Sequence, residues 1–179
     1  MITLLKNPLK RFRKEEAGSV YTIEFVLMLP ILFVTFLFGI ELTTYSNRQF
    51  QLDRGLEVTT RLVRLTTGRF ITHDDLTKAI CDNSGGLANC ETMLRLEMVP
   101  MNPRQFSGLP AMPDCTSAPF PVNPVRGWSL GQQHELMLLR ACYKFTPVVA
   151  SVGLGKLLGA DSDGMGRMVS ISAFVQEPE

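Results

Sequence analysis

The chain has 179 residues, of which 45% are hydrophobic and 20% are charged, and its formal net charge is +1 at pH 7. That length suits one domain of roughly 100–200 residues, and the composition excludes a disordered tail or a polyelectrolyte. A net charge near zero argues against a protein that coats DNA or RNA, so no nucleic-acid partner is expected. The charge is uneven, however, because residues 1–19 hold five basic side chains and two acidic ones directly ahead of the most apolar segment. This arrangement is typical of a membrane protein with a topology signal.

The apolar segment is long enough to cross a bilayer. Phe25–Ile40 contains no charged residue, and extension back to Val20 gives 21 residues whose only charge is Glu24. A helix of that length spans about 31 Å, close to the ~30 Å hydrocarbon core. A buried core helix or a cleaved secretory signal is less favoured, because the run has no polar face and no small-residue cleavage site follows it. We therefore predict a transmembrane helix over residues 20–40.

The basic residues around this segment predict its orientation. Five Lys and Arg residues precede the span, whereas Arg48 and Arg54 are the two in the 20 residues after Ile40. By the positive-inside rule, residues 1–19 form a cytoplasmic leader and the C-terminal part lies outside. In a Gram-negative bacterium this places the protein in the inner membrane, with its C-terminal domain in the periplasm.

Helical character continues beyond the apolar run, over residues 41–68. Leu52, Leu56 and Val63 fall on one face of a 3.6-residue repeat, and Gly55 is the weak point of the pattern. The favoured interpretation is one helix from about residue 20 to 67, whose second half leaves the membrane. The alternative is a span and a separate amphipathic helix, with a break near Thr43-Thr44.

Residues 69–179 are expected to form a small α+β module with an antiparallel sheet. A helix capped by Thr72 is predicted to reach about Cys81, because acidic residues follow the threonine and a glycine-bearing turn follows the cysteine. Further predicted elements are strands at Thr92–Val99, Glu135–Phe145 and Met168–Val175, a proline-rich loop over residues 100–131, and a short helix or turn at Val148–Leu158.

Side-chain alternation assigns faces in two of these strands. In the first, Leu94, Leu96 and Met98 are expected on one face, with Arg95 and Glu97 on the other. In the last, the residues expected to share a face are Val169, Ile171, Ala173 and Val175.

Four cysteines lie on the predicted outer side: Cys81, Cys90, Cys115 and Cys142. An even number in an oxidising compartment predicts two disulfides, and four cysteines permit three pairings. We favour Cys81–Cys90, because the first ends a predicted helix, the second opens a strand, and a turn joins them. The second bridge, Cys115–Cys142, would then attach the proline-rich loop to the sheet.

No pattern for catalysis or cofactor binding emerges. The cysteine spacings are not C-x-x-C, and His73 and His134 are expected to be surface or loop residues. Gly153–Lys156 lacks Walker A spacing, and Asp161–Gly164 begins like a calcium loop but lacks the later ligands, so we interpret it as a turn. We expect no enzymatic activity, metal site, cofactor or small-molecule substrate.

Glu24 is the unusual residue of the apolar segment. A carboxylate inside a membrane span costs a few kcal/mol unless it is paired or lies near the interface. Two interpretations remain open: a hydrated residue at the membrane surface, or a charge that requires a specific partner.

The N-terminal part of the chain resembles a known family. Residues 11–19 (RFRKEEAGS), 20–25 (VYTIEF), 29–32 (LPIL) and 38–41 (FGIE) are similar to the N-terminal segment of TadE-like proteins, which are pseudopilins or minor pilins of the bacterial Tad (Flp, type IVb) pilus. The match covers about residues 10–60, and the ending at residues 174–178 resembles the family loosely. The resemblance implies a non-catalytic role in pilus biogenesis, adherence and biofilm formation. The implied partners are membrane lipid, other pilin or pseudopilin subunits and the Tad assembly platform, and the implied locations include a surface pilus.

The resemblance also implies site residues. A prepilin peptidase would cut at Gly18 or Ser19, and Glu24 with Phe25 would serve assembly, Glu24 by pairing with the free amine of a neighbouring subunit. The family pattern places Glu fifth after the cleaved Gly. Glu24 is sixth after Gly18, and cleavage after Ser19 restores the spacing but puts Ser where Gly is preferred.

Two other classes of protein remain as alternatives. One is an uncleaved single-pass inner-membrane scaffold of the pilus or secretion platform, and the other is a membrane-anchored periplasmic binding domain. A helix that continues across Thr43-Thr44 favours a pilin-like protein or a scaffold over a binding domain.

Overall fold

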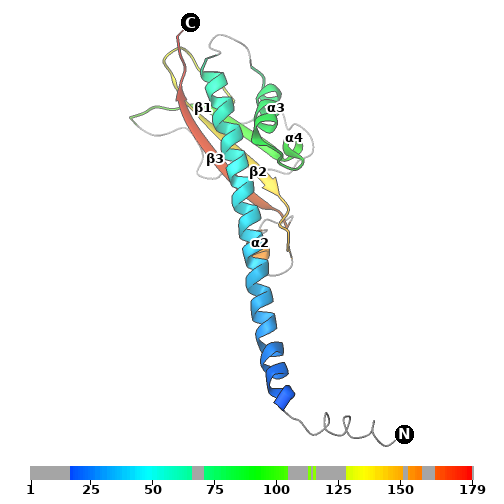
Figure 1. Cartoon of the computed structure of the whole chain (residues 1–179). Coiled ribbons are helices and arrows are strands. Elements are labelled where there is room, and N and C mark those ends of the chain that lie inside the picture. The colour runs from blue at the N-terminus through cyan, green and yellow to red at the C-terminus, as the bar shows by residue number, and fades with distance from the viewer. Residues whose placement is uncertain are drawn as a thin grey trace, which may run out of the picture. The chain divides into compact units, whose positions relative to one another are not determined.

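The fold is α+β, as predicted, with a long N-terminal apolar helix followed by a three-stranded antiparallel sheet. The computed structural model describes residues 17–65, 71–104, 113, 115, 128–150, 153–158 and 164–178. The elements are α2 (Ala17–Arg64), α3 (His73–Ser84), α4 (Cys90–Met93), β1 (Leu94–Pro100), β2 (Leu136–Phe145), α5 (Gly153–Leu158) and β3 (Gly166–Val175), as Figure 1 shows. The chain divides into two compact units, residues 1–40 and residues 41–179.

The helix α2 is continuous over 48 residues, so the predicted single helix is confirmed and a break at Thr43-Thr44 is wrong. It begins at Ala17 and ends at Arg64, three residues earlier at each end than expected. Its apolar part is long and hydrophobic enough to cross a membrane, by length and composition. Residues 1–16 of the expected leader, and residues 66–68 of the expected helix extension, lie outside the described part of the chain.

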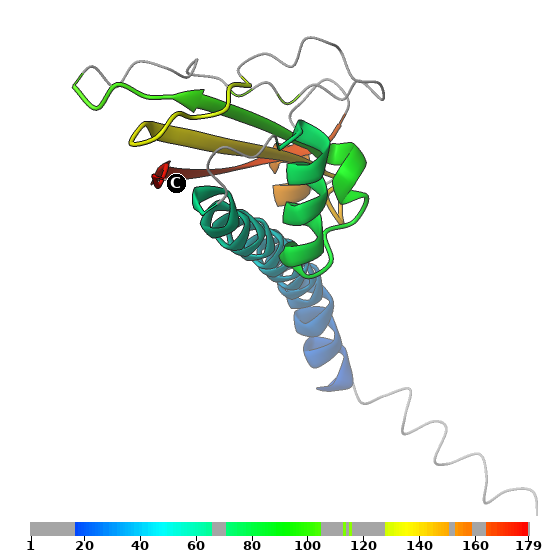
Figure 2. The ribbon, with the colours of Figure 1, turned by 90° about the horizontal axis from the view of Figure 1, so that it is seen from above.

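The sheet has the order β1-β2-β3, with both pairs antiparallel, and Figure 2 shows the strands side by side in one layer. The central strand β2 is buried on both faces over nine of its ten residues. The register pairs Leu96 with Ala141, and Ala141 with Ser170. Trp128 adds an isolated parallel bridge to Met98 on the open edge of β1.

The core lies between one face of this sheet and the helices α2 and α3. As predicted, the α2 face formed by Leu52, Leu56 and Val63 is buried. These side chains join Leu76 and Ile80 of α3 and a set from the three strands: Leu94, Leu96, Met98, Met137, Leu139, Ala141, Tyr143, Phe145, Met168 and Phe174.

Gly55 is a packing residue rather than a weak point of the helix. A Cβ atom built on it would lie 2.6 Å from the Ile80 carbonyl oxygen and 3.1 Å from the Ser84 Cα atom. Because real Cβ atoms do not approach so closely, only glycine permits α3 to lie this near α2.

The predicted shared faces are correct in both β1 and β3, but the core-facing side of β3 is the side that carries Met168 and Phe174. Leu94, Leu96 and Met98 are buried on the core face of β1 as expected. In β3, however, Met168 and Phe174 face the core, where they pair with Tyr143 and Met137. The shared apolar face of β3 therefore lies on the opposite, more exposed side, and Ile171 is 56% exposed there. Alternation identified the two faces, but the register with β2 decides which face is inside.

The helix α3 starts as predicted and ends later. Thr72 and Asp75 form a reciprocal capping box. Side-chain and backbone hydrogen bonds from Thr72 hold the pKa of the Asp75 carboxyl below its ordinary value. The helix passes Cys81 and ends at Ser84, before Gly85 in the left-handed conformation at φ 83°.

We predict that Gly55→Ala lowers the stability of the second unit. The added methyl group clashes with the Ile80 carbonyl. Overpacking of this kind costs about 1–3 kcal/mol, which equals or exceeds the ~1 kcal/mol that alanine gains in helix propensity. Denaturant unfolding in detergent measures the change. Gly39→Ala on the same helix is the control, because no atom lies within 4 Å of its Cβ position. Equal stability of the two variants would contradict the close-packing argument.

Candidate functional site

The residues expected to serve assembly lie on the exposed surface of the apolar part of α2. Phe25 is exposed, and Glu24 makes no hydrogen bond or ion pair with any residue that the structure describes. The hydrophobic side chains around them are also exposed, and none of the 18-residue apolar window is buried. So large an apolar surface requires lipid or other proteins to cover it.

Thr35 and Pro30 in this part of the helix need no hydrogen-bond partner outside it. Thr35 donates its hydroxyl hydrogen to the Ile31 carbonyl oxygen at 2.8 Å, which satisfies the side chain within the helix. Pro30 lies inside the helix and supplies no backbone donor. Both residue types are tolerated in helices surrounded by lipid.

Gly18 and Ser19 lie in the first turn of α2. A peptidase acts on extended backbone more readily than on a helix, so this turn must unwind before either residue could be cut. The side chain of Ser19 is outside the described part of the structure.

Glu41 is a buried acidic residue that the sequence analysis did not single out. Its side chain is only 2% exposed, and its two carboxylate oxygens accept hydrogen bonds from the backbone N–H groups of Val148 and Val149, at 3.1 and 3.0 Å. It thus ties the beginning of the packed part of α2 to the turn that follows β2. The sequence feature that could have indicated this role is the position of an acidic residue directly after the apolar run.

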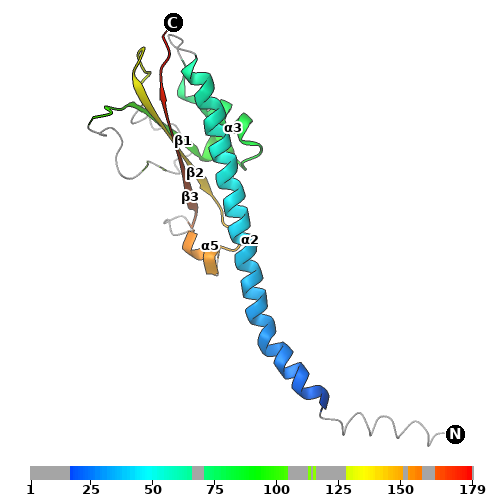
Figure 3. The same ribbon diagram turned by 60° about the vertical axis from the view of Figure 1, so that its left-hand side comes forward.

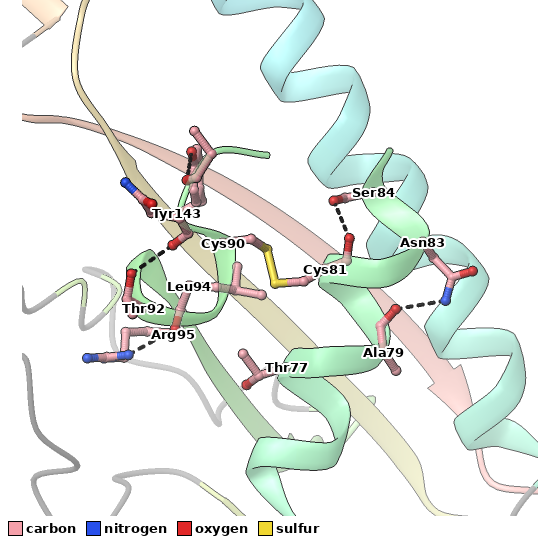
Figure 4. The surroundings of a disulfide bond; sticks show 12 residues. Thr77, Ala79, Cys81, Asn83, Ser84, Cys90, Thr92, Leu94, Arg95 and Tyr143 are labelled. Atoms are coloured by element: carbon pink, nitrogen blue, oxygen red, sulfur yellow. Dashed lines mark hydrogen bonds between the residues drawn. A yellow bond between two sulfur atoms is a disulfide. The ribbon is translucent and has the colours of Figure 1, made fainter. Parts of the chain in front are cut away.

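Both predicted disulfides are present. Cys81 in α3 is joined to Cys90, and the Cα atoms are 5.7 Å apart (Figure 4). Cys90 starts the single helical turn α4, so the prediction that it opens a strand is wrong. The strand begins four residues later, because α4 turns the chain into the sheet. The Tyr143 hydroxyl donates to the Ala88 carbonyl oxygen at 2.7 Å and supports the same corner. Burial raises the pKa of this phenol.

The second disulfide lies on the sheet face opposite the helices. Cys115 is bonded to Cys142 in the central strand, with Cα atoms 5.7 Å apart. On the same face the buried side chains of Glu97 and Arg140 form an ion pair. As predicted, Glu97 lies on the face opposite Leu94, Leu96 and Met98. It is buried because Arg140 neutralises it from the adjacent strand position.

The other sequence candidates do not form a reactive cluster. His73 is the first residue of α3, where its ring makes an edge contact with Trp128 at 5.3 Å, so it is partly buried rather than a surface residue. His134 is exposed in a turn with φ 63°, and Gly153–Lys156 belong to α5. Residues 161–163 lie outside the described part of the chain. Within the described residues, no group of three His, Cys, Asp or Glu side chains could hold a metal ion.

No protein-family model, curated protein or solved structure matches this chain.

We predict that Glu41→Ala loosens the turn at residues 148–149. Loss of hydrogen bonds to a charged acceptor costs about 1.5–3 kcal/mol, and amide hydrogen exchange at Val148 and Val149 should become faster. The matched control is Glu57→Ala on the same helix. Glu57 makes an exposed ion pair with Arg61, and such pairs contribute about 0.3–0.5 kcal/mol. Unchanged exchange at both valines would show that Glu41 does not hold the turn.

The two disulfides should differ in their effect on stability. They close segments with sequence separations of 9 and 27 residues. The chain-entropy relation then gives about 2.6 and about 3.6 kcal/mol for their contributions. Unfolding of the Cys81→Ser/Cys90→Ser and Cys115→Ser/Cys142→Ser double variants measures each loss. A larger loss from the first pair would mean that native-state contacts outweigh loop closure.

Proposed function

We propose that this protein is a non-catalytic, membrane-anchored pseudopilin or minor pilin of the TadE-like type, with a role in Tad pilus biogenesis, adherence and biofilm formation. The observation that carries the proposal is the single helix Ala17–Arg64, which is apolar in its first half and packed on a sheet in its second. A rod that leaves the membrane without a break can align subunits side by side. A binding domain on a flexible tether has no need of such a rod.

The proposed location is the bacterial inner membrane, with the N-terminus in the cytoplasm and residues 41–179 in the periplasm. Support comes from the excess of basic residues before the apolar segment. Two disulfides in the second unit add to this, because such bonds persist in oxidising compartments and are rare in the cytoplasm.

Glu24 is proposed to guide assembly together with Phe25. A carboxylate among apolar helices needs a cationic partner, and a free α-amine with a pKa near ~8 is charged at neutral pH. The amine of a neighbouring subunit, released by a prepilin peptidase at Gly18 or Ser19, would supply that charge. Desolvation offsets much of the attraction, so Glu24 is expected to set register and recruitment rather than stability.

The second candidate is an uncleaved scaffold in the same membrane. The position of Glu24, six residues after Gly18, favours it, because the family pattern has five. N-terminal sequencing of protein recovered from membranes and from sheared surface material distinguishes the two. A new terminus at Ser19 or Val20 supports the pilin. Recovery of the intact leader in both fractions supports the scaffold.

We predict that Glu24→Ala leaves the protein inserted and folded but abolishes its co-purification with the pilus or its assembly platform. The variant removes the charge proposed to recruit the partner, and it breaks no hydrogen bond or ion pair among the residues that the structure describes. Glu57→Ala, an acidic-to-alanine change on the same helix outside the apolar segment, should retain co-purification. Recovery of Glu24→Ala with the machinery at the wild-type level would refute the assembly role and favour the scaffold.

A further inference from the structure

The second unit exposes a small apolar surface that its core does not use. It consists of the turn at residues 146–150 and the short helix α5, and we call it the α5 surface. Leu157 is 73% exposed and Val148 is 54% exposed, and Lys156 beside Leu157 is also exposed. Exposed aliphatic side chains next to a lysine are typical of segments that lie in a membrane interface.

The hydrogen bonds of Glu41 hold this surface close to the end of the apolar run. Glu41 follows Ile40, the last residue of the apolar run, and consecutive Cα atoms are about 3.8 Å apart. The Glu41 carboxylate holds the N–H groups of Val148 and Val149. The turn is therefore within one side chain's reach of the point where the apolar run ends.

Close packing keeps α5 against this turn. A Cβ atom on Gly155 would overlap the Val149 carbonyl oxygen, and one on Gly166 would lie 2.8 Å from the Leu158 carbonyl oxygen. The backbone of α5 thus lies against the turn at Gly155 and against the start of β3 at Leu158. Figure 3 shows α5 beside α2 at one end of the sheet.

We propose that the α5 surface rests on the outer face of the lipid bilayer. Val148 and Leu157 enter the headgroup region, and the Lys156 ammonium group binds lipid phosphates. The inference rests on the membrane span put forward under the proposed function. Lipid is the occupant because Glu41 places the surface at the end of that span. The lipid headgroup region, between the hydrocarbon core and water, lies at that point.

The surface gives the protein a second attachment beside its span. A single helix in a bilayer leaves the domain that it carries able to tilt and rotate. Insertion of two apolar side chains, Val148 of the turn and Leu157 of α5, restricts both motions. The consequence is a defined orientation of the sheet relative to the membrane.

Depth-dependent quenching tests the proposal on the full-length protein. All four native cysteines are in disulfides, so one introduced cysteine is the only thiol that an environment-sensitive fluorophore can label. The protein is reconstituted into vesicles of phosphatidylcholine and phosphatidylglycerol that contain lipids carrying a quencher at a shallow or a deep position. The labelled variants are Leu157→Cys, Leu65→Cys and Phe33→Cys.

The three positions separate the docking from the span. Leu65 is the matched control, because it is also a leucine, is 69% exposed and lies just past the end of α2, about 36 Å along the helix from Glu41. Phe33 lies in the apolar segment and reports insertion. We expect shallow-lipid quenching at residue 157 several-fold above that at residue 65, deep-lipid quenching at residue 33, and weaker quenching at residue 157 in Lys156→Glu.

Each contrary outcome has a definite meaning. Quenching at residue 33, with residue 157 no more quenched than residue 65, overturns the docking and leaves the proposed function standing. A residue 157 label shielded from both lipid quenchers and aqueous iodide overturns the lipid assignment in favour of a protein partner. Absence of quenching at residue 33 overturns the span and the docking together.

Discussion

A three-stranded sheet cannot cover its own core face, and in this protein the second half of α2 covers that face together with α3. An isolated two-stranded hairpin is marginal in water, and independent stability requires three or more strands with a hydrophobic face or a helix packed on the strands. Leu52 and Leu56 on α2 meet Leu139 of the central strand within one buried cluster. The sheet therefore depends on a helix whose other end is a long apolar segment that none of the described residues buries. Any change that shifts α2 lengthwise would remove these residues from the core, which makes the register of the helix the main constraint on the fold.

Polar contacts at both ends of the packed segment fix that register. At the first end, Glu41 binds the turn after β2, Arg48 lies over the Phe145 ring at 5.3 Å, and Gln49 donates to the Val169 carbonyl oxygen. At the second end, the Gln176 amide donates to the Val63 carbonyl oxygen, and Arg64 forms an ion pair with Glu177. Apolar packing alone tolerates small slides, whereas directed hydrogen bonds do not. The packed segment of α2 is thus held at both ends, and Gly55 allows close contact with α3 between them.

Local patterns in the sequence predict the elements well and their partners less well. The face of Leu52, Leu56 and Val63, the cap at Thr72 and both disulfides follow from spacing and residue type. The burial of Glu97, the core-facing side of β3 and the role of Gly55 do not, because each depends on what an adjacent strand or helix places opposite. Glu97 is buried on the sheet face opposite the helices because Arg140 is its cross-strand neighbour. Glu41 was missed for a related reason, since the groups that it binds are backbone N–H groups 107 and 108 residues away. The pilin-type assignment of Gly18, Ser19, Glu24 and Phe25 rests on family resemblance and stays a prediction.

The contact between Val63 and Gln176 has a consequence for biosynthesis. The two residues are 113 positions apart, and β3 is the last strand of a sheet whose spatial order repeats its order along the chain. The ribosome therefore synthesises the buried face of α2 early and β3, the last strand of the sheet, late. For most of synthesis Leu52 and Leu56 therefore have no completed core to enter. A nascent chain in that state exposes apolar side chains that a chaperone can hold, and the domain closes only when the segment around Phe174 emerges.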